Sequence, residues 1–246
     1  MKKQHSLIIG GTRGTGRALA KLFAANGHVV SVIGRRAPAE SDKGIPNIRH
    51  WVVDLLDKAQ LEATLSEILQ TNGKLNSLTF LQRYRGQDDN WAGEIETSLT
   101  ATKQIIERLT NEFDDNGAIV LVSSIIGQFV VPGQPVSYHV AKAAIDHMVR
   151  YYAVTLGPKG IRVNGVSPAS IIKEESREFY LKNEKLLDLF KKIVPLGRIG
   201  TAEEVAQVIA FLCSPQASLV TGQNLVADGG MTLASQESLA RQISSL

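Results

Sequence analysis

The chain of 246 residues has a single cysteine, Cys213, and no long uninterrupted apolar run. One cysteine excludes an intramolecular disulfide and a site built from several cysteines, and it suits a reducing cytoplasm. No stretch approaches the roughly 20 apolar residues of a membrane-spanning helix. The apolar residues 7–9 near the N-terminus are too few for a signal peptide. We therefore expect a cytoplasmic protein without a membrane partner.

The charges also lack any strong bias. The 27 basic and 24 acidic residues give a net charge of +3, without a basic run of the kind that binds nucleic acid. The five histidines lack the spacing of metal-binding pairs such as His-Glu-x-x-His. We expect no nucleic-acid partner and no metal site.

Short apolar runs alternate with helical patterns along the whole chain, as in repeated βα units. Strands are predicted at residues 6–9, 29–33, 48–53, 77–81, 118–122, 162–166 and 224–226. Helices are predicted at residues 14–26, 58–71, 93–113, 137–156 and 202–213. The continuous apolar run 118–122 is typical of a strand covered on both faces. The pattern predicts an α/β fold in one domain, residues 1–246.

A charged segment, residues 174–192, follows the sixth predicted strand and has a helical composition. An insertion at this point projects over the carboxyl ends of the strands, where such sheets bind ligands. We expect residues 170–194 to form a lid over the substrate.

The first predicted strand is followed by a glycine-rich turn and then a helix, an arrangement that lets backbone N–H groups approach a pyrophosphate. The candidate cofactor residues in this turn are Gly10, Thr12, Arg13, Gly14, Thr15 and Gly16. After the second strand stand Arg35 and Arg36, where an acidic residue would favour NAD. Arginine binds phosphate in a bidentate manner, so the pair favours NADP(H). Asp54, after the third strand, either contacts the adenine or caps the next turn.

Tyr138 and Lys142 lie four residues apart on a predicted helix, so their side chains share one face. A neighbouring ammonium stabilises a phenolate, and we expect it to lower the pKa of Tyr138 toward neutrality. Such a tyrosine exchanges a proton with a carbonyl oxygen at ordinary pH. Ser124 would add a hydrogen bond to the same oxygen.

Together these motifs resemble the short-chain dehydrogenase/reductase family over nearly the whole chain. Further matches are residues 162–164, 167–168, 195–198, 221–223 and 228–230. The resemblance implies a doubly wound, mainly parallel, seven-stranded sheet of the Rossmann type with helices on both faces. It also implies direct hydride transfer between a nicotinamide cofactor and a carbonyl or alcohol, and a homo-oligomer, either a dimer or a tetramer; the arginine pair favours NADP(H) as that cofactor. By the same resemblance Tyr138 is the proton donor or acceptor, Lys142 holds the nicotinamide ribose, and Ser124 orients the substrate oxygen.

The sequence departs from the family pattern near the predicted site. Ser98 stands where the family has the asparagine of its catalytic tetrad, and Lys173 stands near a nicotinamide-contacting threonine. Residues 80–86 replace the family's Asn-Asn-Ala-Gly and contain Arg83 and Arg85. These alternate arginines either bind an anionic group of the substrate or form ion pairs with the acidic residues 88–89.

The combined pattern predicts an NADPH-dependent reductase of a small-molecule ketone or other carbonyl compound, with the hydride passing from nicotinamide to carbonyl carbon. One alternative is a non-catalytic NADP-binding homologue that acts as a sensor or supports another subunit. A second keeps the chemistry but runs it as alcohol oxidation or epimerisation. Leu239, Ile243 and Leu246 have helical spacing, and this stripe docks either on a neighbouring subunit or on the chain's own core.

Overall fold

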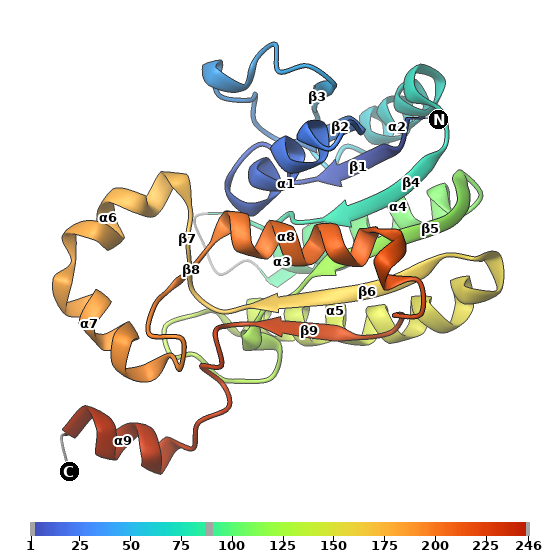
Figure 1. The fold of residues 1–246 in the computed structure, drawn as a ribbon. Helices are drawn as coiled ribbons and strands as arrows, with labels where there is room; N and C mark the ends of the chain where they lie inside the picture. Colours follow the sequence, from blue (N-terminus) through green and yellow to red (C-terminus); the bar gives the residue numbers. More distant parts are fainter. Residues whose placement is uncertain (1–2, 87–90, 245–246) are drawn as a thin grey trace.

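The computed structural model describes residues 3–86 and 91–244. Seven strands form one parallel sheet in the order β3-β2-β1-β4-β5-β6-β9 (Figure 1). The strands of this sheet are β1 (His5–Ile9), β2 (Val29–Gly34), β3 (Ile48–Val52), β4 (Leu75–Phe80), β5 (Phe113–Val122), β6 (Arg162–Pro168) and β9 (Asn224–Ala227). The predicted seven-stranded, doubly wound parallel sheet is therefore confirmed.

Helices cover both faces of the sheet because neighbouring strand residues point to opposite sides. Leu7 and Ile9 of β1 pack against one helix layer, whereas Ile8 packs against the other. The first layer contains α2 (Lys58–Asn72), α4 (Ala101–Leu109) and α5 (Val136–Leu156). The second contains α1 (Gly14–Ala25) and α8 (Ala202–Cys213). Both strand faces are thus buried, as the continuous apolar runs require.

The prediction of one continuous helix over residues 93–113 is wrong, because the helix is interrupted in its middle and ends earlier than predicted. It is divided into α3 (Trp91–Ile95), a π-helical turn (Glu96–Thr100) and α4. The strand β5 already begins at Phe113, which pairs with Leu75 across a register shift in the ladder. An extended pairing with β4 thus replaces the last helical turn that the local pattern predicts.

The segment after β6 leaves the sheet at its carboxyl end. It forms β7 (Ile171–Ile172), α6 (Arg177–Lys182) and α7 (Glu184–Ile193), and β7 pairs with β8 (Gly200–Thr201). Figure 1 shows α6 and α7 projecting beyond the ends of the central strands. The helical prediction for this charged segment is confirmed, and its placement puts it beside the predicted site.

The last helix, α9 (Gln236–Ser244), contacts α7 at the far end of the chain (Figure 1). Ile243 is 45 % exposed and Leu239 is half-buried, whereas Leu246 lies outside the described residues. No helix in the described part of the chain has the length and apolar character needed to span a membrane.

Candidate active site

A cavity of about 860 Å³ lies at the carboxyl ends of the central strands. It brings together predicted cofactor and catalytic residues from five separate segments of the chain, whereas the predicted residue Ser98 is not among those that line it. The predicted residues that line it are Gly10, Thr12, Arg13, Gly14, Thr15, Gly16, Arg35, Arg36, Asp54, Ser124, Tyr138 and Lys142. Lys173 and Tyr180 line the same cavity, and both belong to residues 170–194, the segment predicted to form a lid.

The glycine turn between β1 and α1 is too tight for side chains. Gly10 has a φ of +84°, and a Cβ atom there would lie 2.6 Å from the backbone nitrogen of Gln82. A Cβ on Gly16 would lie 2.4 Å from the carbonyl oxygen of Gly10. These contacts involve backbone atoms, so the turn requires glycine at both positions. Gly10 and Gly16 thus carry no side chain that would keep an anionic group from the backbone N–H groups at the start of α1.

The cavity wall beyond this turn is basic. Arg35 and Arg36 follow β2 and both line the cavity. The acidic residue Asp42 lies in the same loop but is only 4 % exposed, and it forms ion pairs with Arg17 and Lys21 at 2.5 and 3.0 Å. Its carboxylate thus fixes the loop instead of facing the cavity, a role for which the sequence gives no signal.

Asp54 lies on the same wall, after β3. Its Oδ1 atom accepts a hydrogen bond of 3.1 Å from the Leu56 N–H group. The sequence leaves two roles open for Asp54, contact with the adenine and capping of the next turn. The hydrogen bond from Leu56 shows that Asp54 caps this turn.

The lid segment contacts the glycine turn directly. The Gly14 N–H group donates a hydrogen bond of 3.1 Å to Oε1 of Glu175, and Glu174 forms an ion pair with Arg17. The aliphatic part of Lys173 lies against Gly14, where an added Cβ would be 3.1 Å from its Cδ atom. A carboxylate from this segment therefore lies at the N-terminal end of α1, where an anion would bind.

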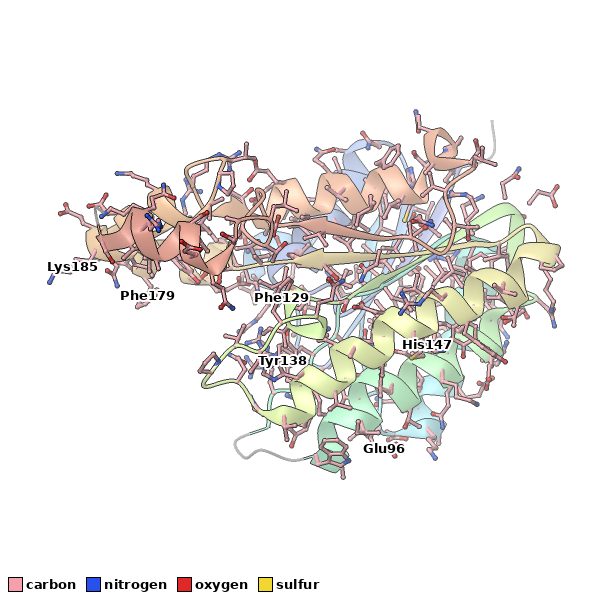
Figure 2. All side chains as sticks on the ribbon, turned by 90° about the horizontal axis from the view of Figure 1, so that it is seen from below. Glu96, Phe129, Tyr138, His147, Phe179 and Lys185 are labelled. Atoms are coloured by element: carbon pink, nitrogen blue, oxygen red, sulfur yellow. The ribbon has the colours of Figure 1, made fainter. Side chains whose placement is uncertain are left out.

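Tyr138, Lys142 and Ser124 come together at the other end of the cavity. Figure 2 shows Tyr138 near the start of α5, on the side toward Phe179, and His147 farther along the same helix. Nζ of Lys142 lies 5.6 Å from the centroid of the Tyr138 ring and donates a hydrogen bond of 2.8 Å to the Val122 carbonyl. Ser124 forms a hydrogen bond with Tyr138 and accepts another from the Ile126 N–H group at 3.3 Å.

The prediction that Lys142 lowers the pKa of Tyr138 toward neutrality is wrong for this arrangement. Burial raises the pKa of Tyr138 above its ordinary value, and the largest opposing effect is the positive charge of Arg83. The guanidinium carbon of Arg83 lies over the tyrosine ring, 4.1 Å from its centroid. Burial also lowers the pKa of Lys142 to about 8, against the opposing charge of Glu94. Desolvation thus outweighs the pairing that helical spacing suggests.

Ser98 does not line the cavity. It is 1 % exposed in the π-helical turn, and its hydroxyl donates a hydrogen bond to Oε1 of Glu94. Glu94 is itself buried, with 3 % exposure, and its charge affects both Tyr138 and Lys142. Glu94 is not among the residues predicted from the sequence, although its position four residues before Ser98 places the two on one helix face.

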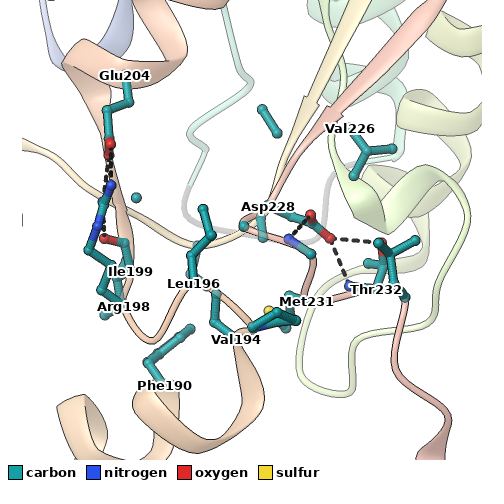
Figure 3. A pocket seen from close by; sticks show the side chains of 18 of the residues that line it. Phe190, Val194, Leu196, Arg198, Ile199, Glu204, Val226, Asp228, Met231 and Thr232 are labelled. Carbon is teal, nitrogen blue, oxygen red and sulfur yellow. Dashed lines mark hydrogen bonds and ion pairs between the residues drawn. The ribbon is translucent and has the colours of Figure 1, made fainter.

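A second cavity of about 800 Å³ is lined by residues of α7, of the segment that follows it and of the loop after β9 (Figure 3). Its wall is largely apolar and includes Phe190, Val194, Leu196 and Met231. Asp228 accepts hydrogen bonds from the Gly230 and Thr232 N–H groups, both at 2.8 Å, and these fix the loop after β9. Ala169, Ser170 and Met231 line both cavities, so the two are adjacent.

A family model described as enoyl-(acyl carrier protein) reductase matches residues 10–232, which include both the glycine turn and the Tyr138–Lys142 pair. The chain belongs to the short-chain dehydrogenase/reductase family. Members of this family are NAD(P)-dependent oxidoreductases, and the match covers every strand of the sheet except β1, which ends at Ile9 just before the match begins.

Curated members of the family are similar over most of their length. The 3-oxoacyl-(acyl-carrier-protein) reductase of Chlamydia muridarum is 34% identical over 246 residues, which cover 92% of this chain and 96% of the relative. The corresponding reductase of Thermotoga maritima is 31% identical, with 92% and 97% coverage.

Solved family structures share the fold. The Cj0485 dehydrogenase has a TM-score of 0.85 and 25% identity, covering 95% of this chain and 96% of that one. ElxO, solved with NADP bound, has a TM-score of 0.81 and 26% identity, covering 94% and 100%. A short-chain dehydrogenase from Leptospira borgpetersenii, solved with bound NAD+, has a TM-score of 0.81 and 22% identity, covering 94% of each chain.

Proposed function

We propose that this protein is an NADPH-dependent carbonyl reductase that uses Tyr138, Lys142 and Ser124. The observation that carries the proposal is the convergence of these three side chains with the glycine turn on one cavity. A protein that only binds nucleotide needs no tyrosine, lysine and serine at the nicotinamide end. The similarity to 3-oxoacyl-(acyl-carrier-protein) reductases supports reduction of a ketone.

The residues present fit NADPH along the length of the cavity. Arg35 and Arg36 would hold the 2′-phosphate, because a guanidinium matches phosphate in charge and geometry. The N–H groups of the glycine turn would hold the pyrophosphate once the carboxylate of Glu175 has moved away. NADPH would supply the hydride when bound.

The remaining steps belong to this chain's own side chains. Ser124 would hold the substrate oxygen by a hydrogen bond, and Tyr138 would give that oxygen its proton. The raised pKa of Tyr138 keeps the phenol protonated at neutral pH, as a proton donor in a reduction requires. The buried Glu94 carboxylate favours the charged form of Lys142, so the Glu94–Ser98 pair would act behind the site in place of the family's asparagine.

The proposal is tested by following NADPH oxidation with a panel of ketones for the wild type and Tyr138→Phe. Loss of the phenolic proton should lower kcat by about 10²–10⁴-fold while NADPH binding, measured by fluorescence, persists. Tyr151→Phe is the matched control, because Tyr151 lies on the same helix and is 59 % exposed. NADPH binding without turnover of any ketone would favour a sensor or supporting subunit instead.

Cofactor choice has its own test. Replacing Arg35 and Arg36 by alanine should weaken binding of NADPH at least about tenfold relative to NADH, since two phosphate-binding side chains are lost. Equal effects on the two cofactors would contradict a role in holding the 2′-phosphate.

A further inference from the structure

The segment after β4 places two arginines beside the predicted catalytic tyrosine. Arg83 and Arg85 both line the main cavity. They belong to a different wall from Arg35 and Arg36, because they follow β4 whereas the latter pair follows β2. The acidic residues 88–89, the other partners that the sequence suggests for Arg83 and Arg85, lie outside the described residues.

Arg83 is held in a defined orientation. Its guanidinium carbon lies 4.1 Å from the centroid of the Tyr138 ring, and its Nη2 donates a hydrogen bond of 3.1 Å to Oε1 of Gln134. A guanidinium has five N–H donors in one plane, and stacking on an aromatic ring leaves the edge of that plane available. Such an edge suits bidentate binding of a carboxylate or phosphate.

The charge around Arg83 is not balanced by the groups lining the cavity. Lys173 joins the two arginines, and it is close enough that both lower its pKa, in addition to the larger effect of its own burial. Within the described residues, seven basic side chains but only the carboxylates of Asp54 and Glu175 line this cavity. Asp54 caps its own turn, and Glu175 accepts a hydrogen bond from Gly14. Like charges gathered in this way are stabilised by an anion.

We propose that Arg83 and Arg85, assisted by Lys173, bind an anionic group of the substrate, so that the ketone reduced here is an oxo acid. This inference rests on the proposed function and names its substrate class. Because Arg83 lies on the ring of the proton donor itself, the anion it binds is only a short carbon chain away from the reacting carbonyl. The geometry therefore favours a carboxylate one or two carbons from the ketone, as in 2-oxo and 3-oxo acids.

The first test compares each acid with its neutral ester. The kcat/KM values of acetoacetate and methyl acetoacetate, and of pyruvate and methyl pyruvate, are measured with NADPH for the wild type, Arg83→Ala, Arg85→Ala and Arg85→Lys. The wild type should prefer the acid in at least one pair. That preference should fall at least about tenfold in each alanine variant and be partly kept by Arg85→Lys. Arg177→Ala removes an exposed cation that does not line the cavity and should leave the preference unchanged. A wild type that prefers both esters, or a preference unaffected in Arg83→Ala and Arg85→Ala, would overturn the inference.

The second test does not depend on turnover. Acetoacetate and pyruvate are titrated calorimetrically into each protein in the presence of saturating NADP+, and the Kd of NADPH is measured in parallel. Acid binding that weakens at least about tenfold without either arginine supports the site, even if no ketone is reduced and the proposed function fails. Acid binding that is equal in all variants overturns it. A loss of NADPH affinity with unchanged acid binding also overturns it, because the arginines would then serve the cofactor.

Discussion

Replacing Glu175 by glutamine is expected to tighten NADPH binding. In the structure its carboxylate accepts a hydrogen bond from the Gly14 N–H group at 3.1 Å, at the end of α1 where the proposed site would place the pyrophosphate. The carboxylate and the pyrophosphate are both anions, so they compete for this position and repel each other if both are near it. Glutamine removes the charge with little change in size.

The magnitude follows from the exposure of this side chain. A hydrogen bond to a charged group is worth about 1.5–3 kcal/mol in a sheltered position. Glu175 is exposed, and screening by solvent reduces a surface interaction to about 0.2–1 kcal/mol. The Kd of NADPH should therefore fall by at most about fivefold, with about twofold a central expectation at low ionic strength.

The assay is a fluorescence titration of NADPH at low and high salt. Glu178→Gln is the matched control, because Glu178 is an exposed lid residue paired with Lys182 and does not line the cavity. The gain for Glu175→Gln should shrink at about 1 M salt, where the screening length is about 3 Å. An unchanged or larger Kd for Glu175→Gln at low salt would refute competition between this carboxylate and the cofactor.

Three further results are expected. Gly16→Ala should weaken NADPH binding and cost roughly 1–3 kcal/mol of folding free energy, because its Cβ would lie 2.4 Å from a backbone oxygen. Gly157→Ala is the control, because a Cβ at that position meets nothing within 4 Å. Equal melting temperatures for the two variants would contradict this prediction. The pH–rate profile for ketone reduction should stay flat up to about pH 7, because Tyr138 stays protonated and Lys142, whose pKa is lowered to about 8, still carries its charge. Arg83→Ala should move the alkaline limb higher, because the largest opposing charge is removed, and a downward move would contradict the assignment. Glu204, whose pKa its arginine partner lowers from 4.5 to about 2, should stabilise the fold fully above pH 4.5 and lose that contribution as the pH falls toward 2. Because this carboxylate is 47% exposed, its contribution to the free energy of unfolding is at most about 1 kcal/mol. It is measured by comparing the acid denaturation of the wild type with that of Glu204→Gln, and identical curves for the two proteins would contradict it.

The sheet and the glycine turn could be predicted from sequence because their signals are local. Apolar runs fix which segments become buried strands, and Gly10 and Gly16 are required by contacts with backbone atoms in or beside the turn. The same holds for Tyr138 and Lys142, whose common face follows from helical spacing alone. Local patterns thus predicted the cofactor and catalytic candidates that line the cavity, apart from Ser98, which is buried behind it.

The electrostatics of the site could not be predicted in this way. The pKa of Tyr138 depends on its burial and on Arg83, which comes from a segment 55 positions earlier in the chain. Glu94 gains its influence by being buried beside α5, and Asp42 by reaching Arg17 on a neighbouring helix. The break in the predicted helix 93–113 likewise follows from strand pairing between Phe113 and Leu75. Each of these depends on which segments the fold brings together.

The proposed function is tested most directly with NADPH that carries deuterium at the position on C4 of the nicotinamide from which the hydride is transferred. The experiment determines whether this deuterium appears in the alcohol product. The ketones are acetoacetate, pyruvate and their methyl esters. Each is incubated with the wild type, Tyr138→Phe and Tyr151→Phe, and the products are analysed by mass spectrometry and NMR. We expect one deuterium on the carbinol carbon of the product with the wild type and Tyr151→Phe, and almost none with Tyr138→Phe. Labelled alcohol formed equally well by Tyr138→Phe, or NADPH binding with no labelled alcohol from any ketone, would contradict a reductase that depends on this tyrosine.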